Sequence, residues 1–292
     1  MDAKLRRSML FIPGNNPGML QNGGVFGADC VILDLEDAVA PTEKDAARFL
    51  IAHALRTVDY GCSEKVIRIN PLDTFAAEDI KAVVPCGPDT ILVPKVESAD
   101  DIRAAVQMIA AAELPGQNPV KIIALLETPR GIIEAYNIAK ADPRVVGLAL
   151  GAEDYTAGLG AMRTKEGTEI FTARTIVVNA AAAADVQSID TPYTDANDED
   201  GLLADTELAK QLGFKGKLSI NPRQIDVIHT VFNPSEKDIE WAEQVIQAIR
   251  KAESEGSGVA SLNGKMVDLP VVNRAERTLQ LARLLGLIGG AE

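Results

Sequence analysis

The chain has 292 residues, a formal net charge of −13, and 47% hydrophobic residues with only 4% aromatics. Its acidic balance argues against binding to nucleic acid or to anionic membrane surfaces, which attract basic proteins. Neither an apolar leader nor an apolar run of membrane-spanning length is visible, so we expect a soluble, cytoplasmic protein. The three cysteines lack metal-type spacing and are expected to be reduced.

Eight short apolar segments follow one another along the chain. Each is typical of a buried strand because it is brief, continuously apolar and bounded by turn or charged residues. A nearly continuous aliphatic run is expected of strands in a parallel sheet that helices cover on the outside. The predicted strands are 8–13, 30–36, 65–70, 90–96, 122–126, 145–151, 184–190 and 217–221.

Helix signals fill the intervals between these strands. Ser98 and Ser235 are expected N-caps, Thr128 is an N-cap followed by Pro129 at the first helical position, and Gly213 is a typical helix stop. The acidic residues after Ser98 favour a helix start because they suit the helix dipole. The predicted helices are 42–58, 99–114, 130–141, 166–184, 198–212 and 236–255.

The alternation of eight strands with helices predicts a (β/α)8 TIM barrel over residues 1–255. Gly256-Ser257-Gly258 interrupts the pattern, so residues 256–292 are expected to form a C-terminal extension with a helix at 273–285. A doubly wound open sheet is the alternative. It is disfavoured because Gly14 and Gly18, after the first strand, do not have the Gly-x-Gly-x-x-Gly spacing of a dinucleotide site.

Charged and polar residues gather at the carboxyl ends of the predicted strands, the edge that carries the active site in such barrels. They are scarce elsewhere in the strands, so their clustering indicates a functional edge. In strand order they are Pro13 and Gly14; Asp34, Glu36 and Asp37; Arg68 and Asn70; Lys95; Glu127; Glu153 and Asp154; Asp190; and Asn221 and Arg223.

Glu127 and Asp154 follow two consecutive strands and predict a metal site. Neighbouring strands lie about 4.8 Å apart, so both carboxylates can reach one small ion. Without an ion they would repel and raise a pKa. Mg²⁺ prefers oxygen ligands and often takes one or two carboxylates together with water and substrate. We therefore predict that Glu127 and Asp154 bind Mg²⁺.

Arg68 lies inside an apolar strand and is expected to point into the barrel mouth, since side chains alternate along a strand. A buried arginine needs a carboxylate partner, which the substrate or the protein can supply. The protein's candidates are Asp34 and Glu36, and the two possibilities are compatible.

Proton transfer has few candidates in this chain. His53 falls on the predicted helix 42–58 and His229 on a helix expected after the eighth strand, and both are expected to be surface or packing residues. A carboxylate, a lysine or water must then serve as acid or base. Lys95 could in principle form a Schiff base, but neighbouring Glu97 and the metal pair favour an electrostatic role.

Seven short motifs occur in order at the strand ends. They are 8–14 (SMLFIPG), 34–39 (DLEDAV), 67–70 (IRIN), 94–97 (PKVE), 126–131 (LETPRG), 151–154 (GAED) and 220–225 (INPRQI). Each is weak alone, but together they resemble the HpcH/HpaI aldolase and malyl-CoA lyase superfamily, and within it the citrate lyase beta-subunit family (citryl-CoA lyases). The resemblance covers essentially the whole chain.

The resemblance implies a Mg²⁺-dependent carbon–carbon lyase that cleaves a citryl thioester to oxaloacetate and an acetyl thioester. It implies Mg²⁺ on Glu127 and Asp154, chelation of the metal by the keto acid, and a catalytic, substrate-binding Arg68. Glu127, Pro13 and Lys95 would also contact the substrate. Implied partners are a citrate lyase alpha subunit and an acyl carrier protein (the gamma subunit), with a homo-oligomer such as a trimer or hexamer.

The segment 264–270 (GKMVDLP) resembles the part of malyl-CoA lyases that closes over a neighbouring subunit's site, and Asp268 matches the proposed acid/base there. Asn221 departs from the histidine of many relatives, which places a proton-transfer role at that position in doubt. Two alternatives stay open: a malyl-CoA or methylmalyl-CoA lyase of the same superfamily, and a non-catalytic scaffold subunit.

Overall fold

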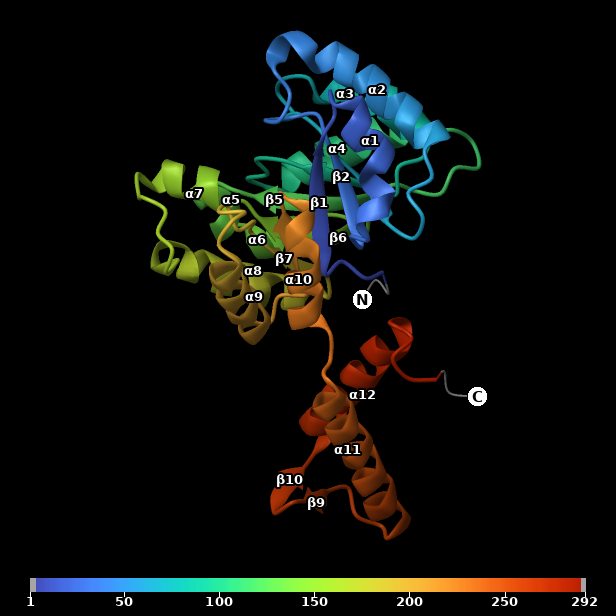
Figure 1. Ribbon diagram of the computed structural model, residues 1–292, viewed down its shortest axis with the longest axis vertical. Coiled ribbons are helices and arrows are strands. Elements are labelled where there is room, and N and C mark those ends of the chain that lie inside the picture. The colour runs from blue at the N-terminus through green and yellow to red at the C-terminus, as the bar shows by residue number, and fades with distance from the viewer. Residues whose placement is uncertain (1–3, 290–292) are drawn as a thin grey trace. The chain divides into compact units, whose positions relative to one another are not determined.

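The computed structural model of this chain describes residues 4–289, which form two compact units divided between His229 and Thr230. The first unit is a closed barrel of eight parallel strands (Figure 1), which confirms the predicted TIM barrel. The barrel closes because β1 pairs in parallel with both β2 and β8. The strands are β1 (Ser8–Pro13), β2 (Cys30–Asp34), β3 (Glu64–Arg68), β4 (Thr90–Val93), β5 (Lys121–Leu126), β6 (Val145–Leu150), β7 (Gln187–Asp190) and β8 (Gly216–Ser219).

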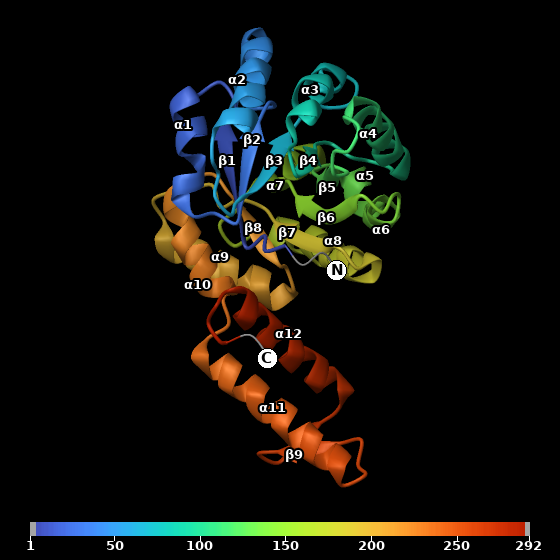
Figure 2. The ribbon, with the colours of Figure 1, turned by 90° about the vertical axis from the view of Figure 1, so that its right-hand side faces the viewer.

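Helices follow the strands and surround the barrel (Figures 1 and 2). The longer ones are α2 (Lys44–Thr57), α3 (Ala76–Val83), α4 (Ala99–Ala112), α7 (Ala152–Leu159), α8 (Phe171–Ala184), α9 (Glu199–Leu212) and α10 (Ile225–Phe232). Short helices are α1 (Pro17–Asn22), α5 (Pro129–Ile133) and α6 (Ala135–Ala139), with 3-10 turns at η1 (Gly23–Phe26), η2 (Pro41–Glu43), η3 (Val84–Cys86), η4 (Thr168–Ile170) and η5 (Pro222–Gln224).

The helix predicted over 130–141 is two short helices, and the helix predicted over 166–184 begins with η4 and becomes α-helical only at Phe171. The predicted caps Ser98 and Thr128 both accept backbone N–H groups, from Asp101 and Gly131. Cap residues in the sequence therefore predict where these helices begin. The break between α5 and α6 and the 3-10 turn before α8 have no comparable sequence signal.

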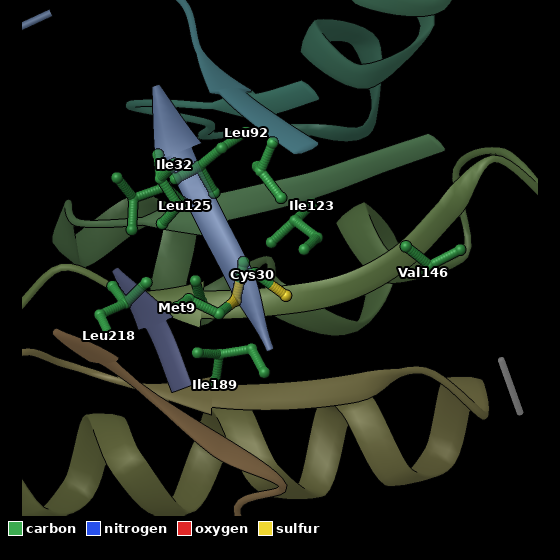
Figure 3. Packing of buried hydrophobic residues seen from close by; sticks show 11 residues of the cluster. Met9, Cys30, Ile32, Leu92, Ile123, Leu125, Val146, Ile189 and Leu218 are labelled. Atoms are coloured by element: carbon green, nitrogen blue, oxygen red, sulfur yellow. The ribbon is translucent and has the colours of Figure 1, made fainter. Parts of the chain in front are cut away.

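An aliphatic core fills the barrel (Figure 3), with members from every strand. Side chains that point inward alternate with side chains that face the helices. Val66 of β3 belongs to this core, so Arg68, two residues later, points to the same side at the end of the strand. The core residues are Met9, Cys30, Ile32, Val66, Leu92, Ile123, Leu125, Val146, Ala149, Ile189 and Leu218.

The second unit contains α11 (Glu236–Ser254), β9 (Ala260–Leu262), β10 (Lys265–Val267) and α12 (Leu269–Leu284). The two helices lie side by side (Figure 2), and the hairpin joins them through Asn263-Gly264, both at positive φ. Their shared core contains Ala242, Val245, Ile249, Val267, Ala275 and Leu279.

The division between the units lies earlier than the predicted one at residue 255, because α11 buries its apolar face against α12. α12 also starts earlier than predicted. Asp268 is its N-cap and accepts the Val271 N–H at 3.3 Å, while Pro270 lies in the first turn, where a missing N–H is tolerated. Within residues 4–289, no helix combines the length and the apolar character needed to cross a membrane.

Candidate active site

A cavity of about 470 Å³ lies at the carboxyl ends of the barrel strands. Four predicted site residues line it: Pro13, Arg68, Glu127 and Asp154. Lys95 also reaches this region, because its ammonium Nζ lies 3.7 Å from Asp154 Oδ2. The fold therefore brings together all of the predicted site residues that belong to the barrel.

Arg68 is held in a fixed orientation by protein carboxylates. Its Nε and Nη2 donate to the two oxygens of Asp34 at 2.7 and 2.6 Å, and its Nη1 lies 2.9 Å from Glu36 Oε2. The Phe11 ring packs 4.7 Å from the guanidinium carbon. Burial opposes the charge, but Asp34 and Glu36 raise the pKa of Arg68 above its usual value. The residue thus makes the internal ion pair and still presents a permanent positive charge to the cavity.

Glu127 is almost fully buried, with 4% of its surface exposed. Its Oε1 accepts the backbone N–H of Lys95 at 2.8 Å. Its other side lies against Gly151, where a Cβ atom would be 2.6 Å from Glu127 Cβ and 2.7 Å from its Oε2. Burial, with the charges of Glu36 and Asp154, raises the pKa of Glu127 to about 8. A glycine at position 151 is therefore required for this carboxylate to occupy its place.

Lys95 adopts a left-handed backbone conformation with φ of 51°, which is uncommon for a residue with a side chain. This turn directs its N–H toward Glu127 while its ammonium lies between two acids, 3.6 Å from Glu36 Oε1 and 3.7 Å from Asp154 Oδ2. Burial opposes the charge, but Glu36 and Asp154 raise the pKa of Lys95, so the ammonium stays protonated. Strained backbone of this kind concentrates at functional sites.

Asp154 lies in the first turn of α7, which begins directly after β6. Its side chain is 44% exposed, in contrast to Glu127. Carboxylates are favoured at this end of a helix, where the unpaired N–H groups and the helix dipole attract negative charge. The position is the predicted edge of the barrel, although the residue belongs to a helix.

Glu36, predicted as a possible partner of Arg68, makes that ion pair and also lies close to Lys95. It follows β2 and is 3% exposed. Burial raises its pKa to about 7, although Arg68 and Lys95 both oppose the shift. The cavity edge therefore brings several carboxylates and two cations into one network, in which Arg68 and Lys95 link Asp34, Glu36, Glu127 and Asp154.

Residues 7–222 match the family model described as HpcH/HpaI aldolase/citrate lyase. The chain belongs to this family.

Relatives of this family member cover most of its length. A citrate lyase subunit beta from Leuconostoc mesenteroides subsp. cremoris is 48% identical over 289 residues, which cover 98% of this chain and 96% of the relative. The crystal structure of protein CitE from Mycobacterium tuberculosis in complex with magnesium, acetoacetate and coenzyme A has a TM-score of 0.80 at 33% identity, with 97% of this chain and 100% of that chain covered. A citrate lyase beta subunit from M. tuberculosis, complexed with oxaloacetate and magnesium, has a TM-score of 0.68 at 34% identity, with 80% and 100% covered.

Two predicted edge residues, Asn221 and Asp190, and one of the histidines, His229, have structural roles. Asn221 caps η5 by accepting the Arg223 N–H at 3.0 Å. Asp190 is fully buried and pairs with Arg174 at 2.8 Å. His229 Nε2 lies 2.7 Å from Ser8 Oγ, which fits the expected packing role.

Asp268 lies in the second unit, beyond the residues that the family model matches. Its Oδ1 accepts the Val271 N–H, so one of its oxygens has a capping role. The structure thus describes Asp268 as a helix cap, and its predicted chemical role stays a prediction.

Proposed function

We propose that this chain is a citrate lyase beta subunit that cleaves a citryl thioester, on coenzyme A or on an acyl carrier protein, into oxaloacetate and an acetyl thioester. The observation that carries the proposal is the 48% identity to a citrate lyase subunit beta over nearly the whole chain. The convergence of Arg68, Glu127 and Asp154 at one cavity supports it.

Glu127 and Asp154 fit a magnesium ion by the chemistry of their oxygen donors. Residues 4–289 contain no group of three or more acidic, histidine or cysteine side chains placed to hold a metal. A two-carboxylate site is still in keeping with Mg²⁺, which completes its shell with water and substrate oxygens. Burial, and after it the negative charges of Glu36 and Asp154, raise the pKa of Glu127, and a divalent cation would neutralise that negative charge. Bound Mg²⁺ would supply Lewis-acid chemistry at the α-hydroxy-carboxylate of the substrate.

The remaining steps fall to residues of the chain. Once a base removes the hydroxyl proton, the carbon–carbon bond breaks and leaves a thioester enolate, which the fixed charge of Arg68 can stabilise. Lys95 offers a second positive charge for a substrate carboxylate. A Schiff base at Lys95 is disfavoured, because that chemistry needs a lowered pKa and the pKa of Lys95 is raised. The thioester would enter past Pro13 at the cavity rim.

Asp268 is the proposed acid/base, supplied by a neighbouring copy of the chain. Its support is the resemblance of the segment around it to malyl-CoA lyases. The assembly that this role implies is a homo-oligomer, a trimer or hexamer, that works in the cytoplasm with a citrate lyase alpha subunit and the acyl carrier protein.

The test is a citryl-CoA cleavage assay in which malate dehydrogenase reports the oxaloacetate formed. We expect Mg²⁺-dependent turnover that EDTA abolishes and that Glu127→Gln and Asp154→Asn each reduce at least about 100-fold. An EDTA-insensitive rate, or full activity in Glu127→Gln, contradicts the metal assignment. Malyl-CoA and methylmalyl-CoA are assayed alongside, since faster turnover of either favours the rival lyase activity. No turnover of any of the three favours a scaffold subunit.

Mixing two inactive variants tests the role of Asp268. Asp268→Asn and Arg68→Ala subunits, denatured and refolded together, should regain about a quarter of the wild-type rate if each site draws Asp268 from its neighbour. Refolding each variant alone is the control. Absence of any recovery in the mixture, with both variants folded, contradicts a shared site.

A further inference from the structure

The helix α7, which carries Asp154, begins without a side-chain cap of its own. Its N-cap is Gly151, which has no side chain to accept the first N–H groups of the helix. These N–H groups have no partner within a helix and need one from elsewhere. The partner of the Ala152 N–H comes from the end of the neighbouring strand β7: this N–H donates to Thr191 Oγ1 at 3.1 Å.

Thr191 comes directly after β7 and is 1% exposed. Its hydroxyl therefore accepts the Ala152 N–H away from solvent, where water could not easily replace it. Both Thr191 and Ala152 line the cavity that also contains Glu127 and Asp154.

Glu127 explains why the cap comes from another strand. Ser, Thr, Asp and Asn are the usual N-cap residues, but any of them at position 151 would place its Cβ 2.6 Å from Glu127 Cβ. The carboxylate of Glu127 occupies the space that a local cap would need. A glycine at the N-cap and a hydroxyl supplied by β7 are thus two parts of one arrangement.

We propose that Thr191 is a positioning residue for the metal site: its hydroxyl fixes the first turn of α7 and thereby the place of Asp154 relative to Glu127. This inference rests on the proposed magnesium site of the preceding section. Thr191 acts through Ala152 and α7, so its loss should act first on metal affinity. Removal of groups that orient a metal ligand typically lowers metal affinity roughly 10- to 100-fold.

Thr191→Val removes the hydroxyl and keeps the shape of the side chain, whereas Thr191→Ser keeps the hydroxyl. A matched control is Thr206→Val, which removes another fully buried hydroxyl, one that bonds to the Leu202 carbonyl within α9 at 2.6 Å. Mg²⁺ affinity of each purified protein is measured by calorimetry. Hydrogen exchange of the peptide containing Ala152 is measured without metal.

We expect Thr191→Val to bind Mg²⁺ about 10- to 100-fold more weakly and to exchange faster at Ala152, with Thr191→Ser and Thr206→Val close to the wild type. The inference is overturned if the wild type binds Mg²⁺ and Thr191→Val binds it no more weakly than Thr206→Val. It is also overturned if exchange at Ala152 is unchanged. Failure of the wild type itself to bind Mg²⁺ instead overturns the proposed metal site.

Discussion

Replacement of Glu127 by glutamine should stabilise the metal-free protein at neutral pH while it removes a proposed metal ligand. Burial, with the charges of Glu36 and Asp154, raises the pKa of Glu127 from 4.5 to about 8. The folded state therefore binds this proton more tightly than the unfolded state. The resulting stability is fully present below pH 4.5 and is lost as the pH rises toward 8.

The magnitude follows from the two pKa values. At pH 7.5 the unfolded carboxyl is about three pH units above its pKa, whereas the folded carboxyl is still largely protonated. One pKa unit corresponds to 1.36 kcal/mol. Relative to its value below pH 4.5, the free energy of unfolding is therefore lowered by about 4 kcal/mol at pH 7.5 and by less than about 1 kcal/mol at pH 5. Glutamine does not titrate, has nearly the same shape, and keeps an acceptor for the Lys95 N–H.

Urea unfolding in EDTA at pH 5 and pH 7.5 measures this difference. Unfolding of the barrel should be followed by far-UV circular dichroism. Tryptophan fluorescence would report on the second unit instead, because the single tryptophan, Trp241, lies on α11. We expect the free energy of unfolding of Glu127→Gln to exceed that of the wild type by about 3–4 kcal/mol at pH 7.5 and by little at pH 5. Asp154→Asn is the control, since its half-exposed side chain should change stability much less. An equal effect of Glu127→Gln at both pH values would refute the reasoning.

Three further substitutions test the framework of the site. Gly151→Ala should displace Glu127 and lower Mg²⁺ affinity at least tenfold in a folded protein, as calorimetry with a circular dichroism check will show. Lys95→Gly should be about 1 kcal/mol more stable than Lys95→Ala, because only glycine relieves the left-handed backbone; equal unfolding free energies would contradict this. Lys217→Met should lower the unfolding free energy by about 3–5 kcal/mol, because it removes the ammonium Nζ that lies 2.6 Å from Oδ2 of the buried Asp190. Retention of wild-type stability in Lys217→Met would show that Arg174 alone compensates Asp190.

The barrel and its functional edge could be predicted because each strand carries its own signal. A continuous apolar run that ends in a charged residue defines both a buried strand and the edge at which the charge emerges. Arg68 and Glu127 were placed by that logic, and the structure brings both to one cavity. The alternation of side chains also predicted the direction of Arg68, since the pattern has a period of two residues.

The interactions that connect strands to one another could not be predicted in the same way. The bond from Ala152 to Thr191 joins residues 39 positions apart, and no local pattern marks Thr191. The left-handed turn at Lys95 was equally hidden, because lysine gives no sequence signal for positive φ. By contrast, the hairpin of β9 and β10 does have a strong local signal, because Asn263-Gly264 is a typical hairpin turn.

The two raised carboxyl pKa values explain how so many acids can share one edge of the barrel. With pKa values of about 8 and about 7, Glu127 and Glu36 are substantially protonated near neutral pH in the metal-free protein. Arg68 and Lys95 compensate the charge that remains. A cation at Glu127 and Asp154 would displace the proton of Glu127. The net charge of the site would then change by less than the full charge of the cation. If Glu127 and Asp154 bind Mg²⁺ as proposed, the site would exchange a proton for the cation, and this exchange would let a carboxylate as buried as Glu127 serve as a metal ligand.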